Sequence, residues 1–489
     1  MDLDERWNKE FGNGNNKDPN AKEVIKQASE LIMKQHTFIT IEETGEIWYY
    51  DNGVYVPGGE ILIAKECEKM FDYDLNNERL SQIKGHIMRR TYHKHNELDS
   101  DINIINLKNG LYDVNNDVLK DHTANYLSIN QKPITYKKDA KAERFEQFLK
   151  EVLYERDVRT AVEAMAYTFE RDYPIEVIFM LYGLGANGKT VYTSVLTSLH
   201  GEDNVSNVPL TQMVSDRFAL ADLENKDVNI DNELGNQNIK DTAILKRLTG
   251  GSRQRIRIQR KNQRAYDTTL YSKLFFNANK IPNSEDESDA YNRRVIIVTF
   301  PNRFEGPLAD KQLVSKLTTE QEKSGIFNLL MMALRLVRNN KDIYVNEKTI
   351  EEKRLKYLRA HNPVKAFLEE TIDWEKSTED DDMHYIPKAD LHLVYGIYCG
   401  IHRLPVDNFD VFCKRIKKIS VITVEKEEIP IIINQVRKSL GEKTSDGKDK
   451  QTSCWSGITL TEEFAHELLD AKSKAKAKEL EQKGQERLD

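Results

Sequence analysis

A glycine-rich octapeptide, GLGANGKT, occupies residues 183–190 and matches the pattern GxxxxGK[ST] at every fixed position. The apolar run IEVIFMLY precedes it as an expected strand, and VYTSVLTSLH follows as an expected helix. Backbone N–H groups of such a loop and the helix N-terminus face phosphate charge. We expect Lys189 to reach the β- and γ-phosphates and the Thr190 hydroxyl to bind Mg²⁺. The predicted nucleotide-binding residues are Gly183, Leu184, Gly185, Ala186, Asn187, Gly188, Lys189 and Thr190. The alternative is a chance glycine turn.

An acidic strand end, DVNIDNEL, follows at residues 227–234. Glu233 is the candidate for orienting and polarising an attacking water, and Asp231 is the candidate for holding Mg²⁺ through a water. Acidic turns are common on protein surfaces, so a turn with solvated carboxylates is the alternative.

Two further polar features follow apolar stretches. Asn279 ends the predicted strand LFFNAN and could contact the γ-phosphate, although asparagine before a proline turn is also ordinary turn chemistry. Arg293 and Arg294 precede the strand-like VIIVTF. An arginine that enters a neighbouring subunit's nucleotide site stabilises transition-state charge. The alternative is a surface pair bonded to carboxylates such as Glu285 or Asp289.

A basic segment, SRQRIRIQRKNQR, lies between the acidic strand and LFFNAN, at residues 252–264. It holds six basic residues and no acidic one, and its isoleucines alternate with arginines, as in a strand. The sequence predicts a cationic hairpin that grips the phosphates of a single nucleic-acid strand, with contacts from Arg257, Arg260 and Lys261. A solvated strand face is the alternative.

These motifs need an α/β sheet to position them, and residues 176–300 alternate strand-like and helical runs accordingly. We predict an α+β accessory region over 1–100, a helical domain over 101–175 that opens with a hairpin, and the ATPase domain over 176–345. A linker helix with a further domain over 346–460 and a charged helical tail over 461–489 complete the chain.

The bulk composition is that of an ordinary soluble chain of 489 residues, with 39% hydrophobic and 31% charged residues. The net charge of −8 does not argue against nucleic acid, because binding depends on local patches. Four scattered cysteines form no CxxC pair, so neither a zinc ribbon nor a disulfide framework is indicated. Without a signal peptide or an apolar run long enough for a membrane span, we expect a cytoplasmic protein that does not contact membranes.

The order of these motifs resembles that of superfamily 3 helicases, and more closely the helicase part of viral, phage and plasmid primase-helicases. The phrases INLKNGLYDV, YGLGANGKT, LKRLTGG, LFFNANKIP and YNRRVIIVTF carry the resemblance, which covers about residues 100–460. It implies an AAA+-like P-loop ATPase core after a helical domain and before a winged-helix domain. It also implies ATP and Mg²⁺ as ligands, a homo-hexameric ring, and 3′-to-5′ movement on single-stranded DNA at a forked duplex. A separate primase or polymerase is a further expected partner, because the stretch before the helical domain is too short for the family's primase.

The resemblance also assigns individual residues. It places the catalytic acid on Glu233, the sensor on Asn279 and the arginine finger on Arg293 rather than Arg294. Many members have two adjacent acids where this chain has Asn232 and Glu233, which leaves the Mg²⁺ position open between Asp231 and Asn232. The segment FDVFCKRIKK resembles a winged-helix recognition helix, with Lys414 and Arg415 toward DNA. Packing of that helix on the ring, with solvated lysines, is the alternative.

Two functions from different classes fit these observations. The first is an ATP-dependent replicative DNA helicase. The second is a nucleotide-dependent initiator or loader that binds origin DNA and uses ATP mainly for assembly, without processive unwinding. A packaging or remodelling ATPase is a third reading, but such a protein would lack the basic hairpin.

Overall fold

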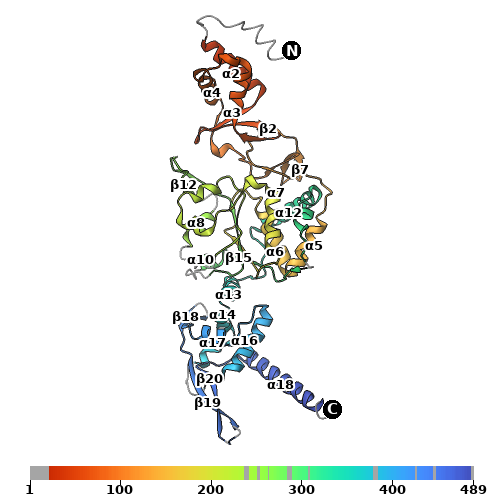
Figure 1. The fold of residues 1–489 in the computed structure, drawn as a ribbon, viewed down its shortest axis with the longest axis vertical. Coiled ribbons are helices and arrows are strands. Elements are labelled where there is room, and N and C mark those ends of the chain that lie inside the picture. Colours follow the sequence, from red (N-terminus) through yellow and green to blue (C-terminus); the bar gives the residue numbers. More distant parts are fainter. Residues whose placement is uncertain are drawn as a thin grey trace. The chain divides into compact units, whose positions relative to one another are not determined.

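The computed structural model describes residues 21–235, 242–250, 254–262, 264–282, 289–306, 309–377, 384–424, 427–443, 446 and 448–485 (Figure 1). The described chain divides into two compact units. The first is drawn from Met1–Leu234, Asp241–Asn279 and Val298–Asn346, and the second from Gly235–Lys240, Lys280–Ile297 and Glu347–Asp489.

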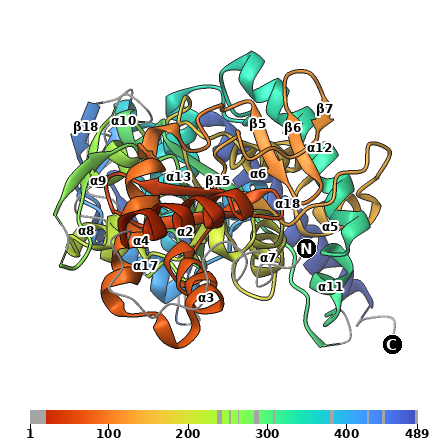
Figure 2. The same cartoon turned by 90° about the horizontal axis from the view of Figure 1, so that it is seen from above.

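The first unit opens with three helices and a four-stranded sheet. The helices are α2 (Ala21–Gln35), α3 (Gly59–Phe71) and α4 (Asn77–Arg90). The strands are β1 (Phe38–Ile41), β2 (Ile47–Asp51), β3 (Val54–Pro57) and β4 (Tyr92–His93), in the order β3-β2-β1-β4. Apolar side chains spaced along α2 and α4, including Ile32, Ile83 and Ile87, are completely buried in one cluster. The three helices lie together in Figures 1 and 2.

A second small sheet, ordered β7-β6-β5-β8, leads into two helices. Its strands are β5 (Ile104–Leu107), β6 (Gly110–Asp113), β7 (Val118–Lys120) and β8 (Gln131–Lys132). Strands β5 and β6 pair antiparallel, which confirms the hairpin predicted at the start of this region. Helices α5 (Glu143–Val152) and α6 (Glu155–Tyr167) follow and bury phenylalanine and alanine side chains.

A five-stranded sheet has the order β10-β11-β14-β9-β15 and belongs to the first unit, except for residues 295–297 of its last strand, which the division assigns to the second unit. The strands are β9 (Ile178–Tyr182), β10 (Val205–Ser206), β11 (Val228–Asp231), β14 (Lys273–Ala278) and β15 (Val295–Thr299). Neighbours from β10 through β9 pair in parallel, as the strand–helix alternation predicted. Both β11 and β14 are buried along their whole length, which is typical of a parallel sheet covered on both faces. The protein is therefore a mixed α/β protein with a parallel sheet.

The remaining elements of the first unit surround this sheet. They are α7 (Lys189–His200), α8 (Leu210–Ser215), α9 (Ala243–Leu248), α11 (Leu313–Leu317) and α12 (Glu320–Asn340), together with the β12 (Ile256–Ile258) and β13 (Tyr266–Thr268) hairpin. Helix α12 ends at Asn340, and the next residue, Lys341, has a left-handed conformation with φ 54°.

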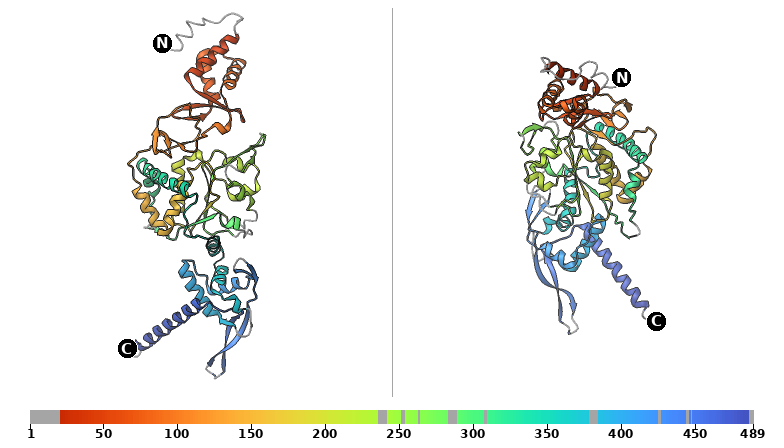
Figure 3. Two further views of the ribbon diagram at one scale, coloured as in Figure 1. Left: turned by 180° about the vertical axis from the view of Figure 1, so that it is seen from behind. Right: turned by 45° about the horizontal axis from the view of Figure 1, so that its top comes forward.

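The second unit combines helices with two small antiparallel sheets. Its helices are α10 (Asp289–Asn292), α13 (Ile350–His361), α14 (Pro363–Thr371), α15 (Trp374–Ser377), α16 (Lys388–His402), α17 (Phe409–Ile416) and α18 (Glu462–Gln485). The sheets are β16 (Tyr385–Pro387), β20 (Asp449–Ser456) and β19 (Asn434–Lys443), and the pair β17 (Val421–Val424) and β18 (Glu427–Pro430). The long hairpin of β19 and β20 is plain in both views of Figure 3. An aromatic core that includes Phe367, Tyr395 and Trp455 holds the helices to the sheets.

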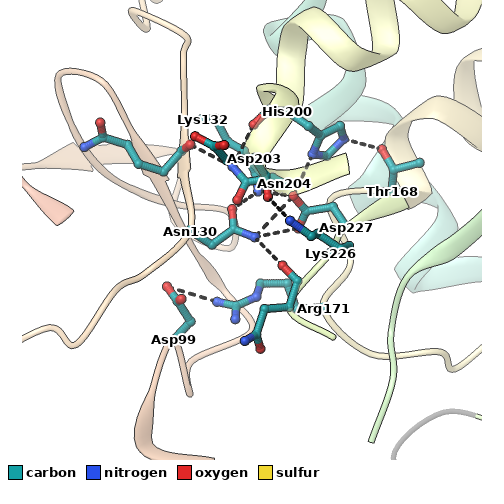
Figure 4. Close-up of polar contacts among 12 residues, drawn as sticks. Asp99, Asn130, Lys132, Thr168, Arg171, His200, Asp203, Asn204, Lys226 and Asp227 are labelled. Atoms are coloured by element: carbon teal, nitrogen blue, oxygen red, sulfur yellow. Dashed lines mark hydrogen bonds and ion pairs between the residues drawn. The ribbon is translucent and has the colours of Figure 1, made fainter. Parts of the chain in front are cut away.

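A buried polar cluster joins the small sheet of β5–β8 to the central sheet (Figure 4). Asp227, at the start of β11, pairs with Lys132 at 2.5 Å and with Nδ1 of His200 at 3.0 Å. The amide of Asn130 donates to the same carboxylate. Burial alone would raise the pKa of Asp227, but the charges of Lys132 and His200 outweigh it and hold that pKa below its ordinary value. These contacts hold the start of β11, and Glu233 follows the other end of the same strand.

Candidate nucleotide-binding site

The glycine loop after β9 turns sharply toward α7. Gly185 and Gly188 have φ values of 101° and 92°, which glycine adopts without steric cost, and Ala186 has φ 49°. A Cβ on Gly188 would lie 2.8 Å from a methyl carbon of Val152, so no larger residue fits between the loop and α5. A Cβ on Gly185 would meet nothing within 4 Å, which leaves the backbone there open to a ligand. The strand–loop–helix order is as predicted.

Lys189 extends back under the loop and is surrounded by neutral acceptors. Its Nζ donates to the carbonyl of Gly183 at 2.6 Å and to Oδ1 of Asn187 and of Asn279, each at 3.0 Å. The side chain is 6% exposed. Desolvation by burial lowers the pKa of Lys189 to about 8, because the charged form loses water and gains no anionic partner. An ammonium held in this way is well suited to receive a phosphate.

A cavity of about 660 Å³ opens between the loop and the ends of three parallel strands. Its lining includes Lys189 and Thr190 after β9, Asn232 and Glu233 after β11, and Asn279 after β14. The carboxyl ends of parallel strands meet at one edge of a sheet, where ligands of α/β proteins bind. The structure therefore brings together candidates that are 90 residues apart in the sequence, and the volume lies within the usual range for small-molecule sites.

Asp231 and Glu233 have different surroundings. The two carboxylate oxygens of Asp231 accept main-chain N–H groups of Glu233 at 3.2 Å and of Leu210 at 3.0 Å, and Asp231 is not among the residues that line the cavity. Asn232 and Glu233 are exposed and do line it. Of the two residues that the sequence left open for Mg²⁺, Asn232 is thus the one at the cavity.

The sequence pattern did not single out Asn277, which also lines the cavity. Its Nδ2 donates to Oδ1 of Asn232 at 3.1 Å. The sequence could have indicated Asn277, because residues two apart on a strand share a face and Asn279 was already a candidate. Arg144, Glu151 and Asp310 are further charged lining residues that the motifs do not include.

The arginine pair lies between α10 and β15, in the second unit. Arg293 is exposed, whereas Arg294 is 7% exposed and donates from Nη1 to the carbonyl of Ala290 at 2.5 Å. Their exposure differs in the direction expected if Arg293 is the residue that reaches a neighbouring subunit.

The basic hairpin forms, with β12 and β13 paired antiparallel and its tip after Ile258. Arg257 and Lys261 are exposed. Arg260 instead pairs with the buried carboxylate of Glu224 at 3.0 Å and donates to the Tyr266 hydroxyl at 3.3 Å. The Ser252, Arg253 and Gln263 positions of the predicted hairpin lie outside the described residues.

In the second unit, α17 carries the basic residues that were assigned to duplex DNA. Lys414 is exposed, and Arg415 pairs with Asp407 at 2.7 Å. Phe412 and Ile416, four residues apart, are buried on the opposite side of the helix.

Polar side chains around residue 95 make contacts within the fold. His93 bonds Glu97 at 2.8 Å, and His95 bonds Asn225 at 3.0 Å. Asp99 is 5% exposed and pairs with Arg171 at 3.2 Å. Among the described residues, no group of three or more His, Cys, Asp or Glu side chains could hold a metal ion, and no helix is long and apolar enough to cross a membrane.

Comparison with known proteins gives two family matches. Residues 5–154 match a model described as "D5 N terminal like", and residues 181–294 match a family of unknown function, DUF5906. The first match supports the resemblance to phage and viral primase-helicases, and with it a role related to replication.

Solved structures of the NrS-1 C-terminal region are distantly similar. One apo structure is 12% identical with a TM-score of 0.48, covering 91% of this chain and 100% of that chain. An A-form apo structure is 13% identical with a TM-score of 0.45, covering 81% of this chain and 87% of that one. At these values the likeness carries no argument about function.

Proposed function

We propose that this protein is an ATP hydrolase of the superfamily 3 type that drives DNA unwinding during replication. The observation that carries the proposal is the convergence of Lys189, Thr190, Glu233 and Asn279 on one cavity at the carboxyl edge of a parallel sheet. The glycine loop leaves its backbone open at Gly185, as a site for phosphates requires.

Five residues that line the cavity have roles in binding or hydrolysis: Lys189, Thr190, Asn232, Glu233 and Asn279. The partners of Lys189 in this structure are neutral and leave its positive charge unbalanced. This charge neutralises the phosphates of the nucleotide. Glu233 accepts a proton from the attacking water and orients it. Asn279, which already bonds Lys189, exchanges that contact for one to the γ-phosphate. Thr190 and Asn232 would hold Mg²⁺ beside the nucleotide, where the ion supplies charge to the developing transition state.

The exposed cations of the hairpin link this site to nucleic acid. The hairpin follows β11 and precedes β14 in the chain, and these are the two strands whose ends carry Glu233 and Asn279. A change at the cavity can therefore move Arg257 and Lys261 along a single DNA strand, whose phosphates they contact without sequence preference. A homo-hexameric ring would enclose the strand and let Arg293 of one subunit complete the site of the next.

The first test is steady-state hydrolysis of ATP with and without single-stranded DNA. Wild-type protein should hydrolyse ATP faster with DNA, and Lys189→Ala should remain folded but inactive. Arg293→Ala should bind ATP without hydrolysing it, and mixing it with Lys189→Ala should restore partial activity. Absence of recovery at every mixing ratio would place Arg293 outside a shared site.

The loader function predicts a different result in the same assays. A loader would hydrolyse ATP slowly, assemble on duplex DNA and separate no strands. Electron microscopy with a non-hydrolysable analogue and single-stranded DNA would count the subunits and show whether the strand passes through the ring.

A further inference from the structure

The side chain of Asn277 has an acceptor oxygen that no described group uses. Asn277 lines the nucleotide cavity and is 4% exposed. Its Oδ1 is buried and has no hydrogen-bond partner among the residues that the structure describes. Buried polar atoms nearly always have a partner, so an unpaired oxygen on a residue that lines a ligand cavity indicates a partner that arrives with the ligand.

The remaining atoms of Asn277 hold the turn that carries Glu233. Its Nδ2 donates to Oδ1 of Asn232 at 3.1 Å, and its main-chain carbonyl accepts the N–H of Leu234 at 2.9 Å. These two contacts fix the residues immediately before and after Glu233. The N–H of Glu233 itself donates to Asp231 at 3.2 Å. Glu233 is therefore an exposed carboxylate on a turn whose position is set from β14.

We propose that Asn277 is a further residue for ATP hydrolysis: its Oδ1 accepts a hydrogen bond from the attacking water while its other contacts position Glu233. This inference rests on the proposed function. An attacking water has two O–H groups and needs two acceptors to direct a lone pair at phosphorus. Glu233 accepts one, and the unpaired Oδ1 of Asn277 accepts the other.

The chemical step balances with these two acceptors. The water oxygen forms the new bond to the γ-phosphorus as the bond from that phosphorus to the bridging oxygen of ADP breaks. One water proton passes to the Glu233 carboxylate and the other remains on the phosphate product. Asn277 stays neutral throughout, since an amide oxygen accepts a hydrogen bond without taking the proton.

Asn229 offers a matched control on the neighbouring strand. It is also a fully buried asparagine, but its amide bonds Ser206 and Val208, and it does not line the cavity. Replacing it tests what the loss of a buried amide does to folding alone. Asn277→Leu provides a second variant with the same number and branching of side-chain heavy atoms but no polar ones, in case Asn277→Ala fails to fold.

The experiment measures ATP affinity and single-turnover hydrolysis separately. Asn277→Ala and Asn277→Leu should bind ATP within about threefold of wild type and hydrolyse it about ten- to a hundredfold more slowly. This loss is smaller than the roughly 10²–10⁴-fold contribution of a general base, because Asn277 orients the water but takes no proton. Asn277→Asp keeps an acceptor oxygen and should retain more of the rate at saturating ATP. Asn229→Ala should melt at a lower temperature but hydrolyse bound ATP at the wild-type rate.

A double variant distinguishes action at Glu233 from a general defect. If both residues act on one water, Glu233→Gln with Asn277→Ala should be no slower than Glu233→Gln alone. The inference would be overturned if the rate losses of the two single variants multiply in the double variant. It would also be overturned if Asn277→Leu hydrolyses ATP at the wild-type rate, or if Asn229→Ala loses as much of the rate as Asn277→Ala. Wild-type protein without ATPase activity would instead overturn the proposed function itself, and the role of Asn277 with it.

Discussion

If the cavity binds ATP as proposed, the buried, uncompensated charge of Lys189 should make the affinity for ATP depend on pH in a defined window. Its pKa of about 8 in the free protein arises from desolvation, and its three acceptors are neutral. A bound phosphate supplies the missing negative charge and raises that pKa. Protonated Lys189 is therefore the form that binds ATP well, and affinity should be lost as the pH rises through about 8.

The size of the effect follows from the fraction of protein that carries the proton. With a pKa of about 8, that fraction falls from about 0.9 at pH of about 7 to about 0.1 at pH of about 9. Because apparent affinity scales with the binding-competent fraction, the dissociation constant of ATP should rise about tenfold over this interval. Equilibrium titration with a fluorescent ATP analogue measures it.

Lys189→Arg is the matched control, because a guanidinium stays protonated throughout this range. Its ATP affinity should be weaker or stronger by a constant factor but should not change between these pH values. A wild-type dissociation constant that is flat with pH, or one that changes equally in Lys189→Arg, would refute the reasoning that a desolvated lysine receives the phosphate.

Three other perturbations test separate parts of the account. Glu233→Gln should bind ATP with near wild-type affinity and hydrolyse it at least about a hundredfold more slowly, as stopped-flow phosphate release would show; loss of binding would make Glu233 structural. Replacing Arg257 and Lys261, two exposed cations of the hairpin, together with Ala should lower the salt slope of single-strand binding by about 0.7 for each lost phosphate contact and abolish stimulation by DNA, while ATPase activity without DNA persists. An unchanged slope would mean that the protein grips DNA elsewhere. Asp227→Asn should lower the thermal unfolding midpoint strongly, because it leaves Lys132 buried without its counter-charge, at a cost of about 3–5 kcal/mol; calorimetry showing no shift would contradict the role given to the buried cluster.

Local sequence patterns predicted the site residues that one stretch of chain positions by itself. The glycine loop needs only the strand before it and the helix after it, and both are encoded in adjacent apolar runs. The basic hairpin was equally accessible, because its alternating isoleucines and arginines place opposite kinds of side chain on opposite faces.

Local sequence patterns could not predict contacts between segments that are distant in the sequence. Asp231 and Glu233 look alike in the sequence, but the N–H of Leu210, on a different segment, holds the Asp231 carboxylate outside the cavity lining. Arg260 was predicted to contact DNA, whereas the structure pairs it with Glu224, 36 residues earlier in the chain. A DNA strand that contacts Arg260 must first displace the Glu224 carboxylate from its guanidinium group.

Strand displacement tests most directly whether ATP hydrolysis at the Lys189 cavity drives strand separation, as we propose. The direct measurement is displacement of a labelled strand from a forked DNA duplex by the purified protein, with ATP, with a non-hydrolysable analogue, and with Lys189→Ala under the same conditions. Wild-type protein with ATP should displace the strand, and neither of the other two reactions should. Vigorous DNA-stimulated ATP hydrolysis without displacement, or equal displacement by Lys189→Ala, would contradict it.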